Sequence, residues 1–527
     1  MARLITALMQ VLLVHPEFPI TYWGFQHSLP LVEKRASLPP LSLVTLAALL
    51  PKHWELRLID MNITPLTDQA LQWADAVLVG GMLIQLPSML QVLQRAKSLG
   101  RKTIVGGPAC TTSPHLFAEA DHVFLGEAEE RQAALVAAVE GSRPMPHLLE
   151  GLPKVRPSLT HVPVPRFELL DVNAYCSMSI QYSRGCPYSC EFCDIIEIFG
   201  RVPRVKSASQ VLAELDTLYA LGFRGSVFFV DDNFIGNKRA VGELLLQVTH
   251  WQAQHGNPFT FYTEASLNLA KEPDLLAAMV NAGFCSVFVG IESPSTKALQ
   301  QSGKKQNVGV DLRAAVRTIT RAGLEVFGGF IVGFDSDSEE IFEEQRALLE
   351  NLPVPLAMVG LLMALPGTAL ARRLATEGRL RQRASGDQFG RPNFEPTLSE
   401  STLLERYALL MKEIYGTSAY YGRCEALLDD IGPPSVHTPT TWADIRYVLR
   451  SMLYGGLLGQ ARIRYWRLLF RGIRRGLFGL RIVTTMVIRG YHLMRYTEEH
   501  LVPRMQAASA EALADLPQLR MLDTAAE

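Results

Sequence analysis

Several features are missing from this sequence, and each absence removes a class of protein. The chain has no run of about 18 uninterrupted apolar residues, so we expect no membrane-spanning helix. Its seven cysteines are too few for a disulfide framework in 527 residues, which favours a reducing compartment. A net charge of −1 gives no nucleic-acid signal, so we expect no nucleic acid partner. The apolar run 5–14 contains Gln10 and lacks a small-residue cleavage site, so it predicts a core strand rather than a signal peptide.

The first part of the chain alternates short apolar runs with helical patterns. Such alternation is typical of an α/β fold with a doubly wound parallel sheet, which binds ligands beyond the carboxyl ends of its strands. We therefore predict a Rossmann-like domain over residues 1–141. The expected strands are Val11–Val14, Leu56–Ile59, Ala76–Val79, Thr103–Val105 and His122–Leu125, and the expected helices are Leu41–Leu50, Leu86–Leu99 and Glu127–Val139.

The chain changes character after residue 141. Six prolines fall within about twenty residues, which predicts an extended linker over 142–177. Longer strand–helix units then follow, and they predict a partial (β/α)6 barrel over 178–395. The expected strands are Met178–Tyr182, Val227–Val230, Thr260–Tyr262, Ser286–Gly290, Glu325–Ile331 and Ala357–Met363. No strand pattern recurs afterwards, so 396–527 is predicted to be helical.

Cys186, Cys190 and Cys193 form a C-x3-C-x2-C pattern in a loop with Gly185 and Pro187. Three thiolates at this spacing can hold three irons of a cubane cluster, which leaves one iron open to a small molecule. The alternative is zinc, but a structural zinc site requires four ligands and usually a second cysteine pair. The other four cysteines are isolated along the chain, which favours the cluster.

This loop resembles the signature of the radical S-adenosylmethionine (SAM) enzymes, including the aromatic Phe192 before the last cysteine. The resemblance implies a [4Fe-4S] cluster whose open iron chelates the amino and carboxylate groups of SAM. It also implies cleavage of SAM to a 5′-deoxyadenosyl radical by an electron from the cluster. An electron donor such as flavodoxin or ferredoxin is then required.

Glycine-containing turns follow three of the amino-terminal strands, and any one of them is consistent with an ordinary tight turn. Placed together before a radical SAM barrel, they resemble the cobalamin-binding domains fused to many such enzymes. The resemblance is carried by residues 15–19, 37–43 and 60–62 and by the glycine-containing turns. It implies cobalamin contacts from Met82, Gln85, Gly106, Gly107, Pro108, Gly126 and Glu127, with the loop Met82–Gln85 beneath cobalt. No histidine lies in an Asp-x-His-x-x-Gly motif, so we expect cobalt to lack a histidine ligand.

Polar residues follow two of the predicted barrel strands. Asp231, Asp232 and Asn233 follow the second strand, and helix capping is the alternative role for this triplet. Glu292 and Ser293 follow the fourth. A sulfonium bearing a ribose and an amino acid requires carboxylates and amides, so these residues are candidate SAM contacts. The set expected from the barrel is Asp231, Asn233, Glu292, Ser293 and, beside the adenine, Gly328.

The carboxy-terminal segment Ile445–Thr497 contains eleven arginines and no Asp or Glu. Aromatic and aliphatic residues separate the arginines, a pattern typical of helices that lie on a membrane surface. The alternative is that the arginines pair with acids elsewhere in the fold, which the neutral total charge permits. We therefore expect a cytoplasmic protein with possible peripheral membrane contact.

The whole architecture resembles the cobalamin-dependent radical SAM enzymes, in the group that includes the hopanoid C-2 methylase. The resemblance implies methyl transfer from methylcobalamin to an unactivated carbon of a small-molecule or lipid substrate. Two alternatives stay open: a radical cyclisation or rearrangement without net methylation, and a cobalamin- or SAM-responsive binding protein that does not turn over.

Overall fold

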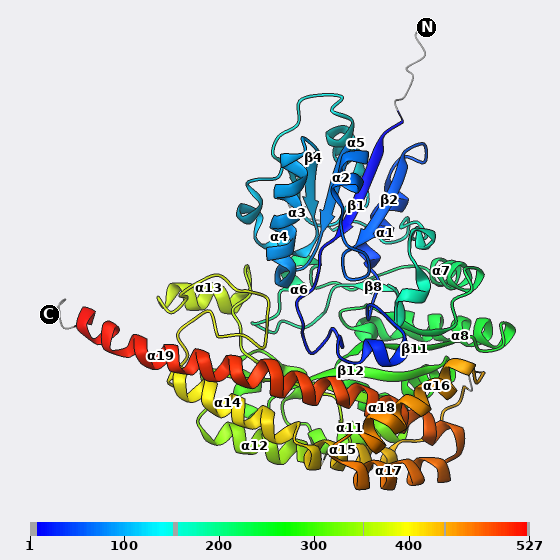
Figure 1. Ribbon diagram of the computed structural model, residues 1–527, viewed down its shortest axis with the longest axis vertical. Coiled ribbons are helices and arrows are strands. Elements are labelled where there is room, and N and C mark those ends of the chain that lie inside the picture. The colour runs from blue at the N-terminus through cyan, green and yellow to red at the C-terminus, as the bar shows by residue number, and fades with distance from the viewer. Residues whose placement is uncertain (1–7, 151–155, 351, 437–438, 524–527) are drawn as a thin grey trace. The chain divides into compact units, whose positions relative to one another are not determined.

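A computed structural model describes residues 8–150, 156–350, 352–436 and 439–523 (Figure 1). The chain divides into two compact units, whose internal structures are given separately below. The first comprises Met1–Ile20, Glu33–Pro187 and Asp194–Asp232, and the second comprises Thr21–Val32, Tyr188–Cys193 and Asn233–Glu527.

The first unit contains a parallel six-stranded sheet in the order β2-β1-β3-β4-β5-β6. The order of the first five strands is that of a doubly wound fold, in which the direction of winding reverses between β1 and β3. Ligands of such folds bind beyond the carboxyl ends of the strands at this reversal. The strands are β1 (Gln10–His15), β2 (Glu55–Asp60), β3 (Ala76–Gly80), β4 (Lys102–Gly106), β5 (His122–Phe124) and β6 (Leu148–Glu150).

Both faces of this sheet are covered, which explains why its strands are continuous apolar runs. On β1, Leu12 and Val14 pack into a core formed with α3 (Leu86–Ser98). Val11 and Leu13 point to the opposite face and pack with α1 (Leu41–Leu49) and α5 (Gln132–Glu140). Short helices α2 (Asp68–Trp73) and α4 (Pro108–Thr112) complete the layers.

The first unit also contains the beginning of the predicted barrel. Strands β7 (Ser177–Ile180) and β10 (Gly225–Phe229) pair in parallel, with α7 (Ala208–Ala220) between them in the chain. The two-residue strands β8 (Ser183–Arg184) and β9 (Arg204–Val205) pair antiparallel around the cysteine loop and α6 (Ile195–Ile198).

The second unit carries the remaining strands, which pair in parallel in chain order from β11 to β14. Helices α8 to α13 precede, separate or follow these strands. The strands are β11 (Phe259–Ala265), β12 (Phe284–Glu292), β13 (Glu325–Val332) and β14 (Ala357–Leu361), and the helices are α8 (Lys238–Gln254), α9 (Pro273–Asn281), α10 (Thr296–Gln301), α11 (Leu312–Arg321), α12 (Glu340–Glu350) and α13 (Ala369–Thr376). All six predicted barrel strands are therefore present, and the α/β fold class is confirmed.

The described residues beyond 396 form helices and no strand, as predicted (Figure 1). The long helices α14 and α19 lie side by side, and α17 packs along α18. These helices are α14 (Glu400–Ile414), α15 (Thr417–Asp430), α16 (Trp442–Ser451), α17 (Arg462–Arg474), α18 (Gly476–Tyr496) and α19 (Val502–Asp523). Among the described residues, no helix is both long enough and apolar enough to cross a bilayer.

Candidate active site

The cysteine loop starts directly after β8 with a glycine that no other residue can replace without strain. Gly185 has φ of +99°, and a Cβ atom there would lie 2.9 Å from the carbonyl oxygen of Gly200. Cys186 follows it and donates its backbone N–H to the same oxygen at 3.3 Å. The glycine therefore allows the start of the loop to pack against the backbone of residues 199–202.

In the second unit, the segment that carries Cys190 and Cys193 is fixed from two sides. The Glu191 N–H donates to the Ser302 carbonyl at 2.9 Å, and its own carbonyl accepts from the Leu370 N–H at 2.9 Å. The Glu191 carboxylate pairs with the Arg373 guanidinium at 3.0 Å. The loop is thus anchored by the end of α10 and the start of α13.

The donor chemistry of this loop fits an iron–sulfur cluster. All three cysteines are free thiols, and the Cys193 N–H donates to the Cys190 carbonyl in a tight turn. Lys304 lies close enough for the charges of Cys190 and Cys193 to favour its protonated form. The three thiolates would hold the cluster, with the cationic Lys304 balancing part of the negative charge.

Lys304 is paired with Glu292, the residue predicted at the end of β12. Their side chains are almost completely buried, with 2.6 Å between Nζ and Oε1. Burial opposes protonation of Lys304, but the Glu292 carboxylate and the two thiolates outweigh it and hold the lysine pKa well above its usual range. Glu292 has φ of +70°, so its backbone is strained at this position. Position 290 requires glycine, because a Cβ atom there would lie 2.3 Å from Glu292 Oε1.

Asp231 and Asp232 hold the backbone that leads into the cysteine loop. The Asp231 carboxylate accepts from the N–H groups of Tyr182 and Ser183 at 2.8 and 2.7 Å and from the Ser183 hydroxyl at 2.6 Å. Asp232 accepts from the Gly185 N–H at 2.8 Å. Burial raises the pKa of Asp231 to about 7 and that of Asp232 to about 6, against the effect of these hydrogen bonds.

Of the remaining predicted cofactor contacts in the second unit, Asn233, Ser293 and Gly328 are buried and Phe192 is partly buried. Asn233 exchanges hydrogen bonds with Ser266, and the Ser293 hydroxyl accepts from the Ser295 N–H. A Cβ on Gly328 would lie 2.7 Å from the ring of Phe330, so close packing accounts for this glycine. The ring of Phe192 meets Phe334 edge-on at 6.0 Å. The contacts of these residues with SAM stay a prediction.

The glycine turns of the amino-terminal domain meet at one edge, because β3, β4 and β5 are neighbours in the sheet. Gly107, with φ of +94°, approaches Gly81 so closely that a Cβ would lie 3.4 Å from the Gly81 backbone. Gln85 spans the first turn: its Oε1 accepts from the Met82 N–H at 2.9 Å, and its Nε2 donates to the Pro16 carbonyl. Met82 is exposed at this edge. A bare backbone edge with an exposed apolar side chain fits the flat, largely apolar ring of cobalamin.

Gly126 and Glu127 follow β5 and have different roles. Gly126 turns the chain with φ of +76° and donates its N–H to Thr111 at 2.9 Å. The buried Glu127 carboxylate pairs with Arg184 at 2.7 Å and with Arg204 at 2.9 Å. Glu127 therefore connects the turn after β5 to Arg184, which precedes Cys186 by two positions.

Sequence reasoning missed the partners of these residues because each lies far away in the chain or outside any motif. Arg184, Lys304 and Arg373 are ordinary cations in the sequence, and only the fold pairs them with Glu127, Glu292 and Glu191. The one local indication of such a pairing in the sequence was Arg184, a cation two residues before the first cysteine of the motif.

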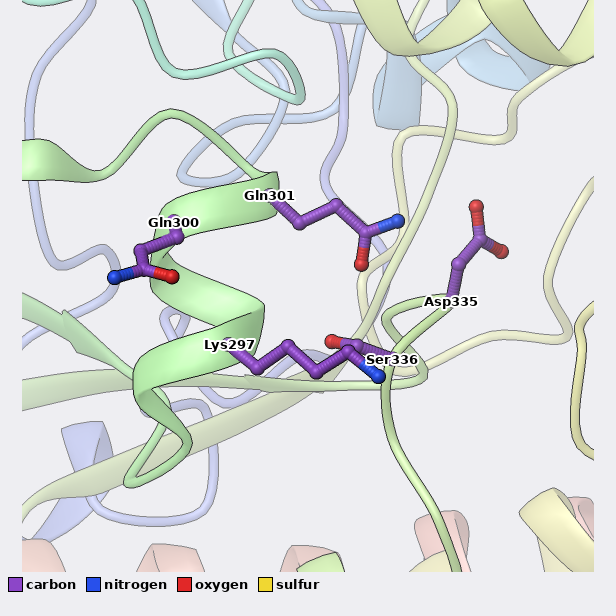
Figure 2. Close-up of a pocket in the computed structure, with 5 residues that line it drawn as sticks. All are labelled: Lys297, Gln300, Gln301, Asp335 and Ser336. Carbon is purple, nitrogen blue, oxygen red and sulfur yellow. The ribbon is translucent and has the colours of Figure 1, made fainter.

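An open cavity of about 440 Å³ in the second unit is lined by polar residues (Figure 2). Lys297 and Gln301 extend from α10 toward Ser336 and Asp335 on the loop after β13, and Gln300 of the same helix completes the lining. None of the predicted site residues lines it. Burial works against ionisation of Asp335, but hydrogen bonds from Arg379 and Arg373 outweigh burial and lower its pKa to about 2. Its carboxylate is thereby already paired, so we do not assign the active site to this cavity.

Family models match three consecutive stretches of the chain. Residues 31–136 match the B12 binding domain, 180–349 the radical SAM superfamily, and 368–504 a domain of unknown function, DUF4070. Together with the cysteine loop and the glycine edge, these matches define a radical SAM enzyme with a cobalamin-binding domain.

Two relatives extend this similarity over nearly the full length. An uncharacterized methyltransferase from Synechocystis sp. is 37% identical, covering 93% of this chain and 92% of that protein. The hopanoid C-2 methylase of Rhodopseudomonas palustris is 35% identical, covering 93% and 94%. The chain therefore belongs to the cobalamin-dependent radical SAM methyltransferases, and its cofactors are a [4Fe-4S] cluster, SAM and cobalamin.

Solved structures show the same fold at lower identity. The radical enzyme OxsB, with aqua-cobalamin and SAM bound, aligns with a TM-score of 0.60 at 16% identity over 96% of this chain and 84% of OxsB. The methyltransferase TsrM from Kitasatospora setae, with cobalamin and a [4Fe-4S] cluster, aligns with a TM-score of 0.57 at 16% identity over 93% of this chain and 99% of TsrM.

Proposed function

We propose that this enzyme transfers a methyl group to an unactivated carbon of a lipid-like, polycyclic or otherwise apolar substrate. The observation that carries the proposal is the similarity to the hopanoid C-2 methylase, which spans 93% of the chain and so includes the carboxy-terminal helices as well as the cofactor domains. A substrate of this kind resides in a membrane, so the proposal includes peripheral contact of the carboxy-terminal segment with the lipid surface.

When bound, the three cofactors supply a carbon-centred radical and a transferable methyl group. The protein positions them and keeps out water. Cys186, Cys190 and Cys193 bind the cluster, and the Glu292–Lys304 pair fixes the end of β12 beside two of these thiols. Gly81, Gly107 and Gly126 would leave the sheet edge open to the cobalamin ring, and Gln85, which accepts from the Met82 N–H, would hold the first turn of that edge.

The thiolate ligands require a reducing compartment, so we place the enzyme in the cytoplasm. An electron donor of the flavodoxin or ferredoxin type reduces the cluster in this proposal.

The test is anaerobic turnover of the reconstituted enzyme with membrane lipid extracts, followed by mass spectrometry. We expect 5′-deoxyadenosine and a lipid heavier by one methylene unit, and neither product from a variant with Cys186, Cys190 and Cys193 replaced by Ala. If deoxyadenosine forms together with an isomeric or cyclised product of unchanged carbon number, the enzyme catalyses a cyclisation or rearrangement and not a methylation. Absence of deoxyadenosine under all reducing conditions would leave only a binding function.

A further inference from the structure

Helix α16 presents apolar side chains on the side that faces solvent. Trp442, Ile445, Leu449 and Leu453 follow one another at spacings of three or four residues, so they lie along one face of the helix, which continues into the next turn. All four are exposed, Trp442 to 79%. The exposed face of a helix in a globular protein is normally polar, so this apolar stripe requires an explanation.

Helix α17 repeats the arrangement. Its inner face is buried through Tyr465, Leu468 and Leu469, which accounts for its packing in the fold. Its outer face carries Ile463, exposed to 86%, and Phe470, exposed to 59%. Burial of the inner face therefore leaves a second set of large apolar side chains facing outward.

The two helices belong to one part of the second unit, because both pack against α18 (Figure 1). The turn between them adds Leu457 and Leu458, exposed to 60% and 64%. We use the name outer apolar face for six exposed apolar residues of this helical part of the unit: Trp442, Leu449 and Leu458 before α17, Ile463 and Phe470 on α17, and Leu477 at the start of α18.

Arginines separate the apolar residues, and most of them are engaged within the fold. Arg462, Arg464 and Arg475, for example, donate hydrogen bonds to Gly459, Ser418 and Leu428. Arg471, Arg489 and Arg495 form ion pairs with Glu425, Glu325 and Glu499, so they stabilise the fold. Arg467 and Arg474 are exposed, and the described part of the structure records no ion pair for either. Both lie on α17 at positions that alternate with Ile463 and Phe470.

The acid-free composition of residues 445–497 means that no carboxylate of this segment opposes an anionic partner. Asp444, just before it, is neutralised locally because it accepts hydrogen bonds from Thr441 and pairs with Arg481 at 3.4 Å. Within residues 445–497 the charges that border the outer apolar face are therefore positive, and the acids Glu425 and Asp429 of α15 are paired with Arg471 of α17.

We propose that the outer apolar face inserts into the headgroup layer of an anionic membrane, with Arg467 and Arg474 contacting lipid phosphates. Large aromatic and aliphatic side chains beside arginines are what an interfacial helix requires, since the apolar groups enter the acyl boundary while the cations stay at the phosphates. The surface docks the enzyme on the membrane and does not cross it. The inference deepens the proposed function by naming the surface through which a lipid substrate is reached.

The test is sedimentation of the full-length, reconstituted enzyme with vesicles of phosphatidylglycerol or of phosphatidylcholine. We expect binding to the anionic vesicles that weakens as salt is added, because salt screens the arginines. Replacing Trp442, Ile463 and Phe470 together by Ser should weaken binding by at least about tenfold. Arg467→Glu with Arg474→Glu should abolish the preference for anionic lipid.

Leu246→Ser is the matched control. Leu246 on α8 is 72% exposed, but its neighbours in the sequence are not rich in arginine. It should bind vesicles as the wild type does. Formation of deoxyadenosine in the absence of substrate measures the cofactor chemistry independently of membrane binding. A variant that cleaves SAM normally but no longer binds vesicles is therefore defective in membrane docking alone. The proposal would be overturned if the triple-Ser variant bound vesicles as well as the wild type does. It would also be overturned if the wild type bound no vesicles and formed a dimer that the triple-Ser substitution dissociates, because the apolar residues would then contact a second copy of the chain.

Discussion

Arg184 and Glu127 form a nearly buried ion pair, with 2.7 Å between Nη1 and Oε2, although 57 residues separate them in the chain. Arg184 uses its second terminal nitrogen to bind Glu129 at 2.8 Å. One end of the pair follows strand β5 of the cobalamin-type sheet, and the other precedes Cys186 by two residues. The pair therefore fixes the start of the cluster loop relative to the glycine edge within the first unit.

Breaking this pair should destabilise the first unit strongly. Arg184→Gln removes the ion-pair partner of the buried Glu129 carboxylate and leaves Glu127 paired with Arg204 alone. The removal of one member of a buried pair typically costs about 3–5 kcal/mol. We expect a lowered melting temperature together with reduced iron content after reconstitution.

The matched control is Arg35→Gln, which breaks the exposed pair with Asp171 in the same unit. An exposed pair contributes at most about 1 kcal/mol, so this variant should melt near the wild type and load iron normally. Equal effects of the two substitutions would mean that Arg184 has no special role.

Gly107 should be required for cobalamin binding. Gly107→Ala places a side chain at φ of +94° and within 3.4 Å of the Gly81 backbone, at the edge where we place the corrin ring. We expect cobalamin to bind about tenfold more weakly or worse in an absorbance titration, for a strain of about 1–3 kcal/mol. Gly100→Ala also places a side chain at positive φ, +68°, but it has no atom within 4 Å and lies away from this edge, so it should keep its affinity for cobalamin.

Lys304 should be required for SAM cleavage but not for folding of the distant helices. Lys304→Met leaves Glu292 buried without its cation and removes positive charge beside Cys190 and Cys193. We expect deoxyadenosine formation to fall by at least about tenfold and the reduction potential of the cluster to become more negative, because less positive charge opposes the thiolates. Lys305→Met, at the exposed neighbouring position, should change neither quantity. An unchanged potential in Lys304→Met would remove the electrostatic role.

The sequence predicted the elements whose signal is local. Each of β1 to β5 was expected within two residues of its observed ends, because a strand buried on both faces is a short continuous apolar run. The elements missed are short: α4 has five residues and β6 has three, too few to show a period. Helix α5 begins at Gln132 and not at Glu127, because Glu127 turns toward Arg184 and Arg204.

The site was predicted only as far as its motifs reach. The cysteine spacing identified the cluster loop, whereas the role of Asp231 as an acceptor for the backbone of Tyr182 and Ser183 depends on the adjacent strands β7 and β10. The acid-free tail was visible in the sequence, but which arginines pair with acids was not, since Glu325 and Arg489 lie 164 residues apart. Tertiary pairing of this kind has no local signature.

Asp231 should make the stability of the first unit depend on pH. Burial raises its pKa from the ordinary 3.8 to about 7, so the folded protein retains a proton that the unfolded chain releases at lower pH. The free energy of unfolding therefore contains a contribution that is complete below about pH 4 and is lost as the pH rises through about 7. The difference corresponds to at most about 4 kcal/mol. Asp231→Asn cannot titrate, so the melting temperature of the cluster-free wild type relative to this variant should fall steadily from pH 5 to pH 8.

The Asn side chain of the Asp231→Asn variant also accepts fewer hydrogen bonds from Tyr182 and Ser183 than the carboxylate does. That cost is independent of pH, so it shifts the melting temperature of the variant by the same amount at every pH. The control is Asp274→Asn, because Asp274 is exposed in the first turn of α9 and should give a flat difference over the same range. A flat difference for Asp231→Asn would show that its carboxylate is ionised throughout and that its three donors outweigh burial.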